Sequence, residues 1–294
     1  MTTPVLEVKG LVKSYGAIRA VAGVSFEVMP GEIFGVIGPN GSGKTTMFNS
    51  VLGQIEPDAG EIHLNGQDIT GLSPLQLNQR GVGRTFQTLQ VFGKMSVRDN
   101  LIVAAQEHEG TMFSRMFAPP DSGLGDKADE LIELFRIGHV AHKPAGSLSY
   151  GQQKLVDIAM AFMSAPDLVL LDEPCAGVNP SLVGGISTLL KQLNQKRASE
   201  AAASGAGGAG GAGGKGGAGG AGGKGGAGGK GGAGGKGGAG GSKPCSFVVI
   251  EHNMDFVMDL CHRILVMVEG EVLAIGTPDE IRSNQQVLDA YLGS

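Results

Sequence analysis

The chain has 294 residues, 52 of them Gly, and a formal net charge of −5. That length allows one large domain or two smaller ones with a substantial buried core, and an acidic chain lacks the basic surface of a nucleic-acid-binding protein. The cysteines, Cys175, Cys245 and Cys261, show no metal-ligand spacing and are odd in number, which favours reduced thiols over disulfides. We therefore expect no nucleic acid among the partners.

The sequence carries no pattern of a signal peptide or of a membrane-spanning helix. Residues 1–10 lack a basic start followed by an apolar core, and no apolar run approaches the roughly 18–20 residues that cross a bilayer. We expect an intracellular protein with no membrane span of its own.

The first part of the chain predicts short strands and one helix. Alternating and β-branched apolar residues predict strands at 5–8, 11–15 and 24–28. The apolar run 32–37 is typical of a strand buried on both faces, and a glycine-rich loop follows it before a predicted helix at 45–52. Strand, glycine loop and helix in this order predict an α/β unit.

The middle of the chain predicts helices instead. Ser96 is a predicted N-cap, and residues 127–135 place their apolar side chains on one helical face. We predict that residues 88–159 form a helical subdomain inserted into an α/β core made of residues 1–87 and 160–294.

The last part of the chain returns to strands. Apolar runs predict buried strands at 168–171 and 247–250. A strand pair at 264–267 and 271–275 follows, and the chain closes with a helix predicted around 278–292.

Residues 204–243 are a low-complexity insertion. From Gly205 to Gly241 every residue is Gly, Ala or Lys, and from Ala206 to Ala239 every third residue is Ala or Lys. Glycine at this density loses too much conformational entropy to order unaided, so we expect a flexible linker. A packed polyglycine array and a lysine-bearing interaction arm remain alternatives.

Residues 38–45, Gly-Pro-Asn-Gly-Ser-Gly-Lys-Thr, match the phosphate-loop pattern G-x-x-x-x-G-K-[ST]. The glycines let backbone N–H groups face phosphate oxygens, and the following helix adds the positive end of its dipole. Lys44 is predicted to reach the β- and γ-phosphates, and the Thr45 hydroxyl to ligate Mg²⁺. The predicted nucleotide-binding residues here are Gly38, Pro39, Asn40, Gly41, Ser42, Gly43, Lys44, Thr45 and Thr46.

An acidic pair follows the predicted strand 168–171. Asp172, at the end of the strand, suits the ligand shell of Mg²⁺, and Glu173 is placed to orient and deprotonate a water. A simpler alternative is that one of the two only caps a turn before Pro174. Together with the glycine loop, the pair predicts hydrolysis of a nucleotide that is bound with Mg²⁺.

Residues 148–153, Leu-Ser-Tyr-Gly-Gln-Gln, are similar to the LSGGQ signature of ABC transporter ATP-binding subunits. In the expected order, Tyr15 matches the aromatic residue that stacks on adenine, Gln87 the Q-loop glutamine and His252 the switch histidine. The resemblance covers the chain except for about 204–243. It implies an α/β fold with a P-loop NTPase (RecA-like) core, an antiparallel β subdomain and an inserted helical subdomain.

The resemblance also implies a role for each matched residue. Ser149, Gly151 and Gln152 would bind the γ-phosphate of a nucleotide held by a second ATPase subunit, so that ATP joins two subunits head to tail. Gln87 would contact Mg²⁺ or water, and His252 would hold the γ-phosphate and the water in line. The implied catalytic residues are Glu173, His252 and Gln87, and the implied metal ligands are Thr45, Gln87 and Asp172.

Departures from the general pattern resemble the ATPases of branched-chain amino acid importers. Tyr150 replaces the second signature glycine, and Ala-Gly-Val-Asn-Pro at 176–180 replaces the usual S-A-L-D. Glu-His-Asn-Met at 251–254 and Gly-Thr-Pro at 276–278 agree with that subfamily, and the insertion at 106–126 favours the larger of its two ATPase subunits.

This closer resemblance implies ATP-driven uptake of branched-chain or other neutral amino acids. It implies three kinds of partner: a second ABC ATPase subunit, transmembrane permease subunits, and a periplasmic or extracellular substrate-binding protein. It places the chain peripherally on the cytoplasmic face of a bacterial inner membrane. A urea or amide importer and an exporter remain alternatives, as do, more remotely, a non-transport ABC ATPase and a structural protein that binds nucleotide without turnover.

Overall fold

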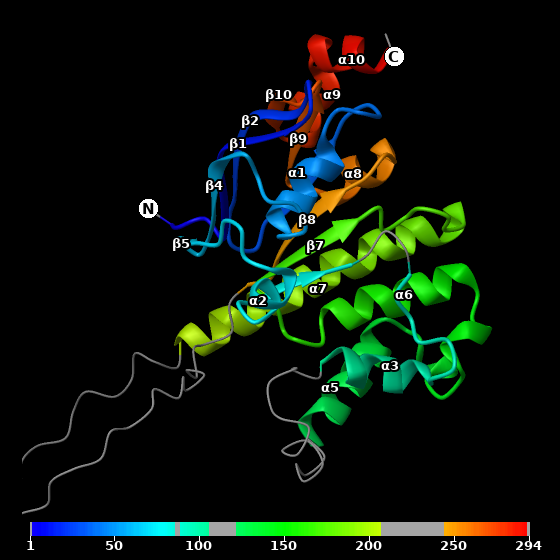
Figure 1. The fold of residues 1–294 in the computed structure, drawn as a ribbon. Coiled ribbons are helices and arrows are strands. Elements are labelled where there is room, and N and C mark those ends of the chain that lie inside the picture. Colours follow the sequence, from blue (N-terminus) through cyan, green and yellow to red (C-terminus); the bar gives the residue numbers. More distant parts are fainter. Residues whose placement is uncertain (1, 86–88, 106–121, 207–243, 293–294) are drawn as a thin grey trace, which may run out of the picture.

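The computed structural model describes residues 2–85, 89–105, 122–206 and 244–292, and two β-sheets organise this part of the chain (Figure 1). The antiparallel sheet consists of β1 (Leu6–Tyr15), β2 (Ile18–Val28), β4 (Ala59–Leu64) and β5 (Gln67–Asp68). The second sheet consists of β3 (Ile33–Ile37), β6 (Val82–Arg84), β7 (Leu168–Asp172), β8 (Ser246–Ile250), β9 (Arg263–Val268) and β10 (Glu271–Gly276).

The order of strands confirms the predicted α/β fold class. The antiparallel sheet has the order β2-β1-β4-β5, and the second sheet has the order β10-β9-β3-β8-β7-β6. In the second sheet β9, β3, β8, β7 and β6 pair in parallel, and only β10 is antiparallel to its neighbour. All five residues of β3 and of β8 are buried, because a parallel sheet is covered on both faces.

The prediction of two strands at 5–8 and 11–15 was wrong, because β1 is a single strand with a bulge. The pairing with β2 changes register between Val8 and Leu11. Gly10 lies in this interval with φ +57°, and its N–H donates to Ser25 Oγ at 2.8 Å instead of to the neighbouring strand. A bulge bends a strand without ending it, so the hydrophobic alternation breaks while the strand continues.

Helices α3 (Val97–Ala104), α5 (Ser122–Leu134) and α6 (Tyr150–Ala161) lie together, away from the antiparallel sheet (Figure 1). Ser96 Oγ accepts from Asp99 N–H at 3.1 Å, which confirms the predicted N-cap of α3. Arg98 joins α3 to α5 through two hydrogen bonds to the Asp129 carboxylate, at 2.7 and 2.9 Å. These helices fall within the predicted helical subdomain, whose boundaries 88 and 159 stay a prediction.

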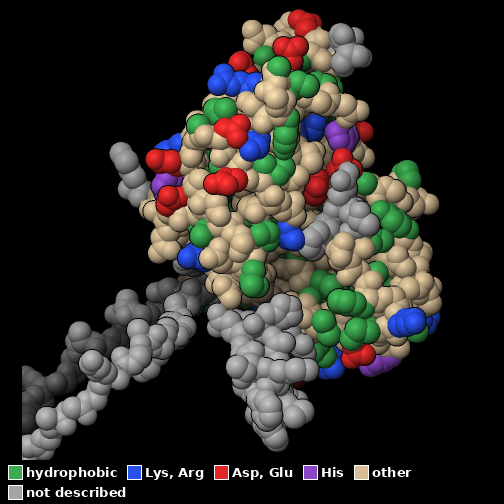
Figure 2. Space-filling view, viewed as in Figure 1, with side chains coloured by type: hydrophobic (Ala, Val, Ile, Leu, Met, Phe, Trp, Pro, Cys, Tyr) green, Lys and Arg blue, Asp and Glu red, His purple; other side chains and the backbone are tan. Residues whose placement is uncertain are grey.

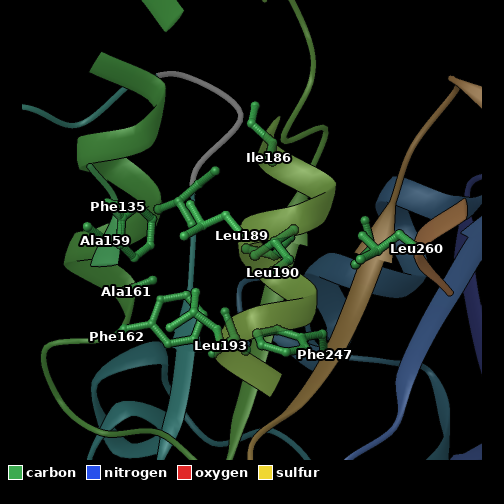
Figure 3. Packing of buried hydrophobic residues seen from close by; sticks show 14 of the residues in the cluster. Phe135, Ala159, Ala161, Phe162, Ile186, Leu189, Leu190, Leu193, Phe247 and Leu260 are labelled. Atoms are coloured by element: carbon green, nitrogen blue, oxygen red, sulfur yellow. The ribbon is translucent and has the colours of Figure 1, made fainter. Parts of the chain in front are cut away.

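Helix α7 (Pro180–Ala206) packs between this helical group and the parallel sheet (Figure 3). Its residues Ile186, Leu189, Leu190 and Leu193 belong to one buried hydrophobic cluster with Phe135, Phe162 and Phe247. The Phe162 ring, after α6, lies 5.7 Å from the Phe247 ring of β8. Full burial of such a ring stabilises the fold by about 1.5–3 kcal/mol, so this cluster fixes the helical group against the sheet.

The sequence predicts a helix over 181–197, and α7 is longer. It continues to Ala206 because residues 198–203 include four alanines, the residue with the highest helix propensity. It therefore includes the first three residues of the segment 204–243 that we predicted to be a flexible insertion. Residues 207–243 lie outside the described part of the chain, so the linker prediction is untested there.

The other α-helices of the described residues are α1 (Lys44–Val51), α2 (Pro74–Asn78), α8 (Met254–Leu260), α9 (Pro278–Ser283) and α10 (Gln285–Leu292). The helix predicted around 278–292 is therefore two helices, which meet at Asn284. The Asn284 side chain accepts from Gln286 N–H at 2.9 Å and so starts the second helix. Among the described residues, no helix combines the length and hydropathy needed to cross a membrane.

The three cysteines are free and buried, as their number and spacing indicated. Burial raises the pKa of all three thiols, that of Cys245 to about 12. A buried thiol with a raised pKa is a poor nucleophile, so the cysteines are core residues and are not candidates for the chemistry.

Candidate functional site

The predicted glycine loop, acidic pair and histidine all follow the carboxyl ends of neighbouring parallel strands. Residues 38–43 follow β3, Asp172 ends β7, and His252 follows β8. Strand β8 pairs with β3 on one side and with β7 on the other, so the three segments meet at one edge of the sheet. Open α/β sheets bind ligands at this edge.

The glycine loop is packed on one side and open on the other. Gly43 has φ +95°, and a Cβ there would lie 2.1 Å from the Ala20 carbonyl oxygen of β2. A Cβ on Gly38 would lie 2.2 Å from the Met267 carbonyl oxygen of β9. A Cβ on Gly41 would meet nothing within 4 Å. Only glycine allows the loop to lie this close to two strands while its outer face stays free for a ligand.

The loop leads into α1 without a side-chain cap. The N-cap residue is Gly43, and no described side chain bonds to the first turn of α1. The unpaired N–H groups of the first turn, together with the helix dipole, form an anion site. The Thr45 side chain is exposed there and Thr46 is half-buried, so a ligand bound by the loop has access to the Thr45 hydroxyl.

The Lys44 side chain stabilises the glycine loop by hydrogen bonds to three of its residues. Its ammonium donates to the carbonyl oxygens of Gly38 and Pro39, at 2.8 and 2.9 Å, and to Ser42 Oγ at 3.2 Å. The side chain is only 5% exposed. Burial lowers the pKa of Lys44, and the charge of Glu173 opposes this effect. The predicted phosphate-binding residue, Lys44, therefore lies close enough to the predicted base, Glu173, for their charges to interact.

Asp172 and Glu173 occupy the turn after β7. Asp172 N–H donates to Thr85 Oγ1 at 3.2 Å, and Glu173 N–H donates to the Ile250 carbonyl of β8 at 2.9 Å. Glu173 has φ +46°, in the left-handed region that non-glycine residues rarely adopt. Burial raises the pKa of Asp172, and the charge of Glu173 raises it further. A carboxyl in such a setting gains stability from a bound cation.

Glu173 and His252 are in direct contact. Glu173 Oε1 lies 3.0 Å from His252 Nε2, and the two side chains are 23% and 47% exposed. The predicted base and the predicted switch histidine therefore come together across the loops that follow β7 and β8. Both side chains remain partly exposed, so the pair can reach a bound water and a phosphate.

Glu251 holds these two loops together, a role that the sequence analysis missed. Its buried carboxylate accepts from Cys175 N–H at 2.7 Å through Oε1, and from the N–H groups of His252 and Asn253 at 2.9 and 3.3 Å through Oε2. The sequence feature that could have revealed this role is a carboxylate directly after the fully apolar run 247–250.

Replacing Glu251 by Gln should destabilise the chain by about 2–3 kcal/mol, because an amide N–H would face a backbone N–H that now donates to a carboxylate. ATP hydrolysis should also fall, since His252 loses the bond that fixes its backbone. Chemical unfolding and steady-state ATPase assays measure the two effects. The exposed Glu56 replaced by Gln is the matched control, and equal stability of the two variants would contradict the assigned role.

A buried charge pair on α6 was also missed. Lys154 is fully buried, and its ammonium has no hydrogen-bond partner among the described residues. Its charge lowers the pKa of both Asp157 and Asp172. Burial nevertheless raises the pKa of Asp157 to about 6, so ionised Asp157 costs stability above that pH and the cost is relieved as the pH falls through it. The sequence feature that could have revealed Lys154 and Asp157 is their spacing, because they place opposite charges at i and i+3 on an otherwise apolar helix face.

The signature-like residues form the start of α6. Ser149 is the N-cap, and it forms a capping box with Gln152: Gln152 N–H donates to Ser149 Oγ at 3.4 Å, and Ser149 N–H donates to Gln152 Oε1 at 3.1 Å. Gly151 is buried. Among the described contacts, none joins these residues to the glycine loop of the same chain. This separation agrees with a site that is completed by a second subunit.

Two predicted site residues stand apart from the others. Tyr15 ends β1 with its ring 49% exposed and with Lys13 Nζ 6.0 Å from the ring centroid. Gln87 lies outside the described residues, so its predicted contacts with Mg²⁺ and water are untested.

The residues present fit a nucleotide with a divalent cation. The glycine loop and the uncapped start of α1 offer N–H donors to phosphates, and Lys44 supplies a positive charge. The Thr45 hydroxyl and the Asp172 carboxylate are oxygen ligands of the kind that Mg²⁺ prefers. The raised pKa of Asp172 indicates a carboxylate that a cation would stabilise.

Comparisons with known proteins agree with this geometry. Residues 21–176 match the family model described as ABC transporter, and residues 271–294 match the model described as branched-chain amino acid ATP-binding cassette transporter. The chain is 32% identical to the high-affinity branched-chain amino acid transport ATP-binding protein BraF of Pseudomonas aeruginosa, over 100% of this chain and 99% of BraF. It is 32% identical to the protein LivG of Escherichia coli, which has the same description, with the same coverage.

Solved structures give the same result. The ADP conformation of MJ1267, an ATP-binding cassette of an ABC transporter, superposes with a TM-score of 0.75 at 28% identity and covers 100% of both chains. A nucleotide-free ATP-binding cassette superposes with a TM-score of 0.74, also at 28% identity, over 99% of this chain and 100% of that one. Members of this family work as dimers with transmembrane permeases. From its sequence and its fold, the chain belongs to the ABC transporter family, as one of the ATP-binding subunits that hydrolyse ATP.

Proposed function

We propose that this ATPase powers the import of branched-chain amino acids. The match of residues 271–294 to the branched-chain amino acid cassette model carries the assignment of cargo, and the full-length similarity to BraF and LivG supports it. The contact of Glu173 with His252 beside the glycine loop supports turnover over a purely structural use of nucleotide.

In the proposed cycle, each part of the site has one task. The N–H groups of residues 38–43 and the start of α1 bind phosphate oxygens, and Tyr15 stacks on the base. Lys44 exchanges its carbonyl partners for the β- and γ-phosphates. Glu173 takes a proton from the attacking water while His252 keeps that carboxylate in place. Thr45, Asp172 and Gln87 would hold Mg²⁺, which would supply positive charge beside the phosphates.

The proposed partners follow from the same assignment. A second ABC ATPase subunit would receive Ser149, Gly151 and Gln152 at its γ-phosphate. Permease subunits would carry the amino acid through the membrane, and a substrate-binding protein outside the membrane would deliver it. The chain would then work at the cytoplasmic face of the membrane, bound to the permease.

Uptake of labelled leucine, alanine, urea and glucose tests the cargo. Cells with the native chain are compared with cells that carry Lys44→Ala, which removes the charge proposed to bind phosphate. Selective loss of leucine uptake, with glucose uptake unchanged, is the expected result. Loss of urea uptake alone would show that the transported compound is urea and would leave the proposed ATPase mechanism unchanged. Unchanged uptake of all four compounds would contradict the import proposal.

A further inference from the structure

The signature-like segment and the loop after Glu173 touch each other through two unusual residues. Gly177 has φ +69°, and a Cβ there would lie 2.9 Å from Tyr150 Cε1 and 3.4 Å from Cζ. The Tyr150 ring therefore rests on the bare Cα of Gly177, although 44% of the Tyr150 residue stays exposed. Hydrophobic side chains are visible over this end of the molecule, where α7 begins (Figure 2).

A second contact joins the same two segments. A Cβ on the buried Gly151 would lie 2.9 Å from Leu182 Cδ1, in the first turn of α7, and 3.8 Å from Val178 Cγ1. The start of α6 therefore packs against residues 177–182 at two adjacent positions. Since a tyrosine ring loses little conformational entropy for the area that it covers, the contact is well suited to fix one segment on the other.

The loop on which Tyr150 rests leads directly to the proposed base. Ala176 N–H donates to the Glu173 carbonyl and Val178 N–H to the Cys175 carbonyl, both at 3.1 Å, so residues 173–178 form a continuous turn. At the other end, Tyr150 follows Ser149, the N-cap of α6. A chain of contacts thus runs from Glu173 through Gly177 and Tyr150 to Ser149.

We propose that the contact of Tyr150 with Gly177 is a positioning contact, which ties the segment that meets the partner's nucleotide to the segment that carries this subunit's own base. The proposal rests on the dimeric mechanism above and deepens it. The geometry makes the two residues depend on each other, because the ring at position 150 leaves no room for a Cβ at position 177.

The test measures kcat and KM for ATP, together with the thermal unfolding midpoint, on variants of the full chain. Gly177→Ala introduces both a strained φ and a clash with the ring. Gly71→Ala is the matched control, because Gly71 has φ +71° and nothing lies within 4 Å of its Cβ position. Both variants should lose thermal stability from the strained φ, and Gly177→Ala should lose more because of the clash. Only Gly177→Ala should lose kcat, by about tenfold, with KM unchanged.

The tyrosine variants separate positioning from folding. Tyr150→Phe keeps the ring and should hydrolyse ATP at the native rate. Tyr150→Ala removes the ring and should lose about tenfold in kcat with KM unchanged, and adding Gly177→Ala to it should cause no further loss of kcat. Native kcat in Tyr150→Ala, or additive losses in the double variant, would overturn the proposal. Because the readout is ATP turnover, failure of the leucine assignment alone leaves this test intact.

Discussion

Replacing Glu173 by Gln should slow ATP hydrolysis at least about a hundredfold while ATP binding remains. The amide cannot accept the proton of the attacking water, yet it keeps the shape of the side chain and its contact with His252, where Glu173 Oε1 now lies 3.0 Å from Nε2. The glycine loop and Lys44 are unchanged, so the affinity for ATP should stay within about twofold. Single-turnover hydrolysis and fluorescent-nucleotide titration measure the two quantities.

The exposed Glu133 of α5 replaced by Gln is the control for a change of charge alone. It should hydrolyse ATP at the native rate. If Glu173→Gln hydrolyses ATP at close to the native rate, Glu173 is not the base, and its contact with His252 has a structural role.

Lys44→Ala should weaken ATP binding about a hundredfold, because a charged hydrogen bond to phosphate contributes about 1.5–3 kcal/mol. The loop itself should loosen as well, since the Lys44 ammonium now bridges Gly38, Pro39 and Ser42. Equilibrium titration of the purified chain with ATP measures the dissociation constant. The exposed Lys94 replaced by Ala is the control and should bind ATP as the native chain does.

An affinity of Lys44→Ala within a few-fold of the native value would show that the N–H groups of the loop alone hold the phosphates. It would also make the variant unsuitable for the uptake experiment, for which Glu173→Gln would then be used.

The site residues at the carboxyl edge of the parallel sheet could be predicted because each group of them is contiguous in the sequence. The glycine loop directly follows a buried strand, and Asp172 and Glu173 directly follow another, so strand order alone brings them near each other. The roles of Glu251 and Lys154 were harder to predict. Each has a local sign in the sequence, but the sequence does not show their distant partners, which are Cys175 for Glu251 and Asp172 for Lys154.

The fold itself was predictable where hydrophobic patterning is strong and not where it is weak. Strands β3, β7 and β8 are continuous apolar runs and were predicted. Strand β5 has only Gln67 and Asp68, both exposed, so no alternation exists to reveal it. The extension of α7 to Ala206 was missed because its last turns are marked by helix propensity and not by an apolar face.

The junction at Glu251 has a consequence for how the site tolerates change in sequence. Three of its donors are backbone N–H groups, at positions 175, 252 and 253, and every amino acid except proline supplies such a donor. The Cys175 thiol also bonds to the Glu251 carboxylate, so exchange of that side chain removes one contact and leaves the three backbone bonds in place. The junction therefore depends on the chemistry of position 251 more than on the chemistry of the residues that it binds.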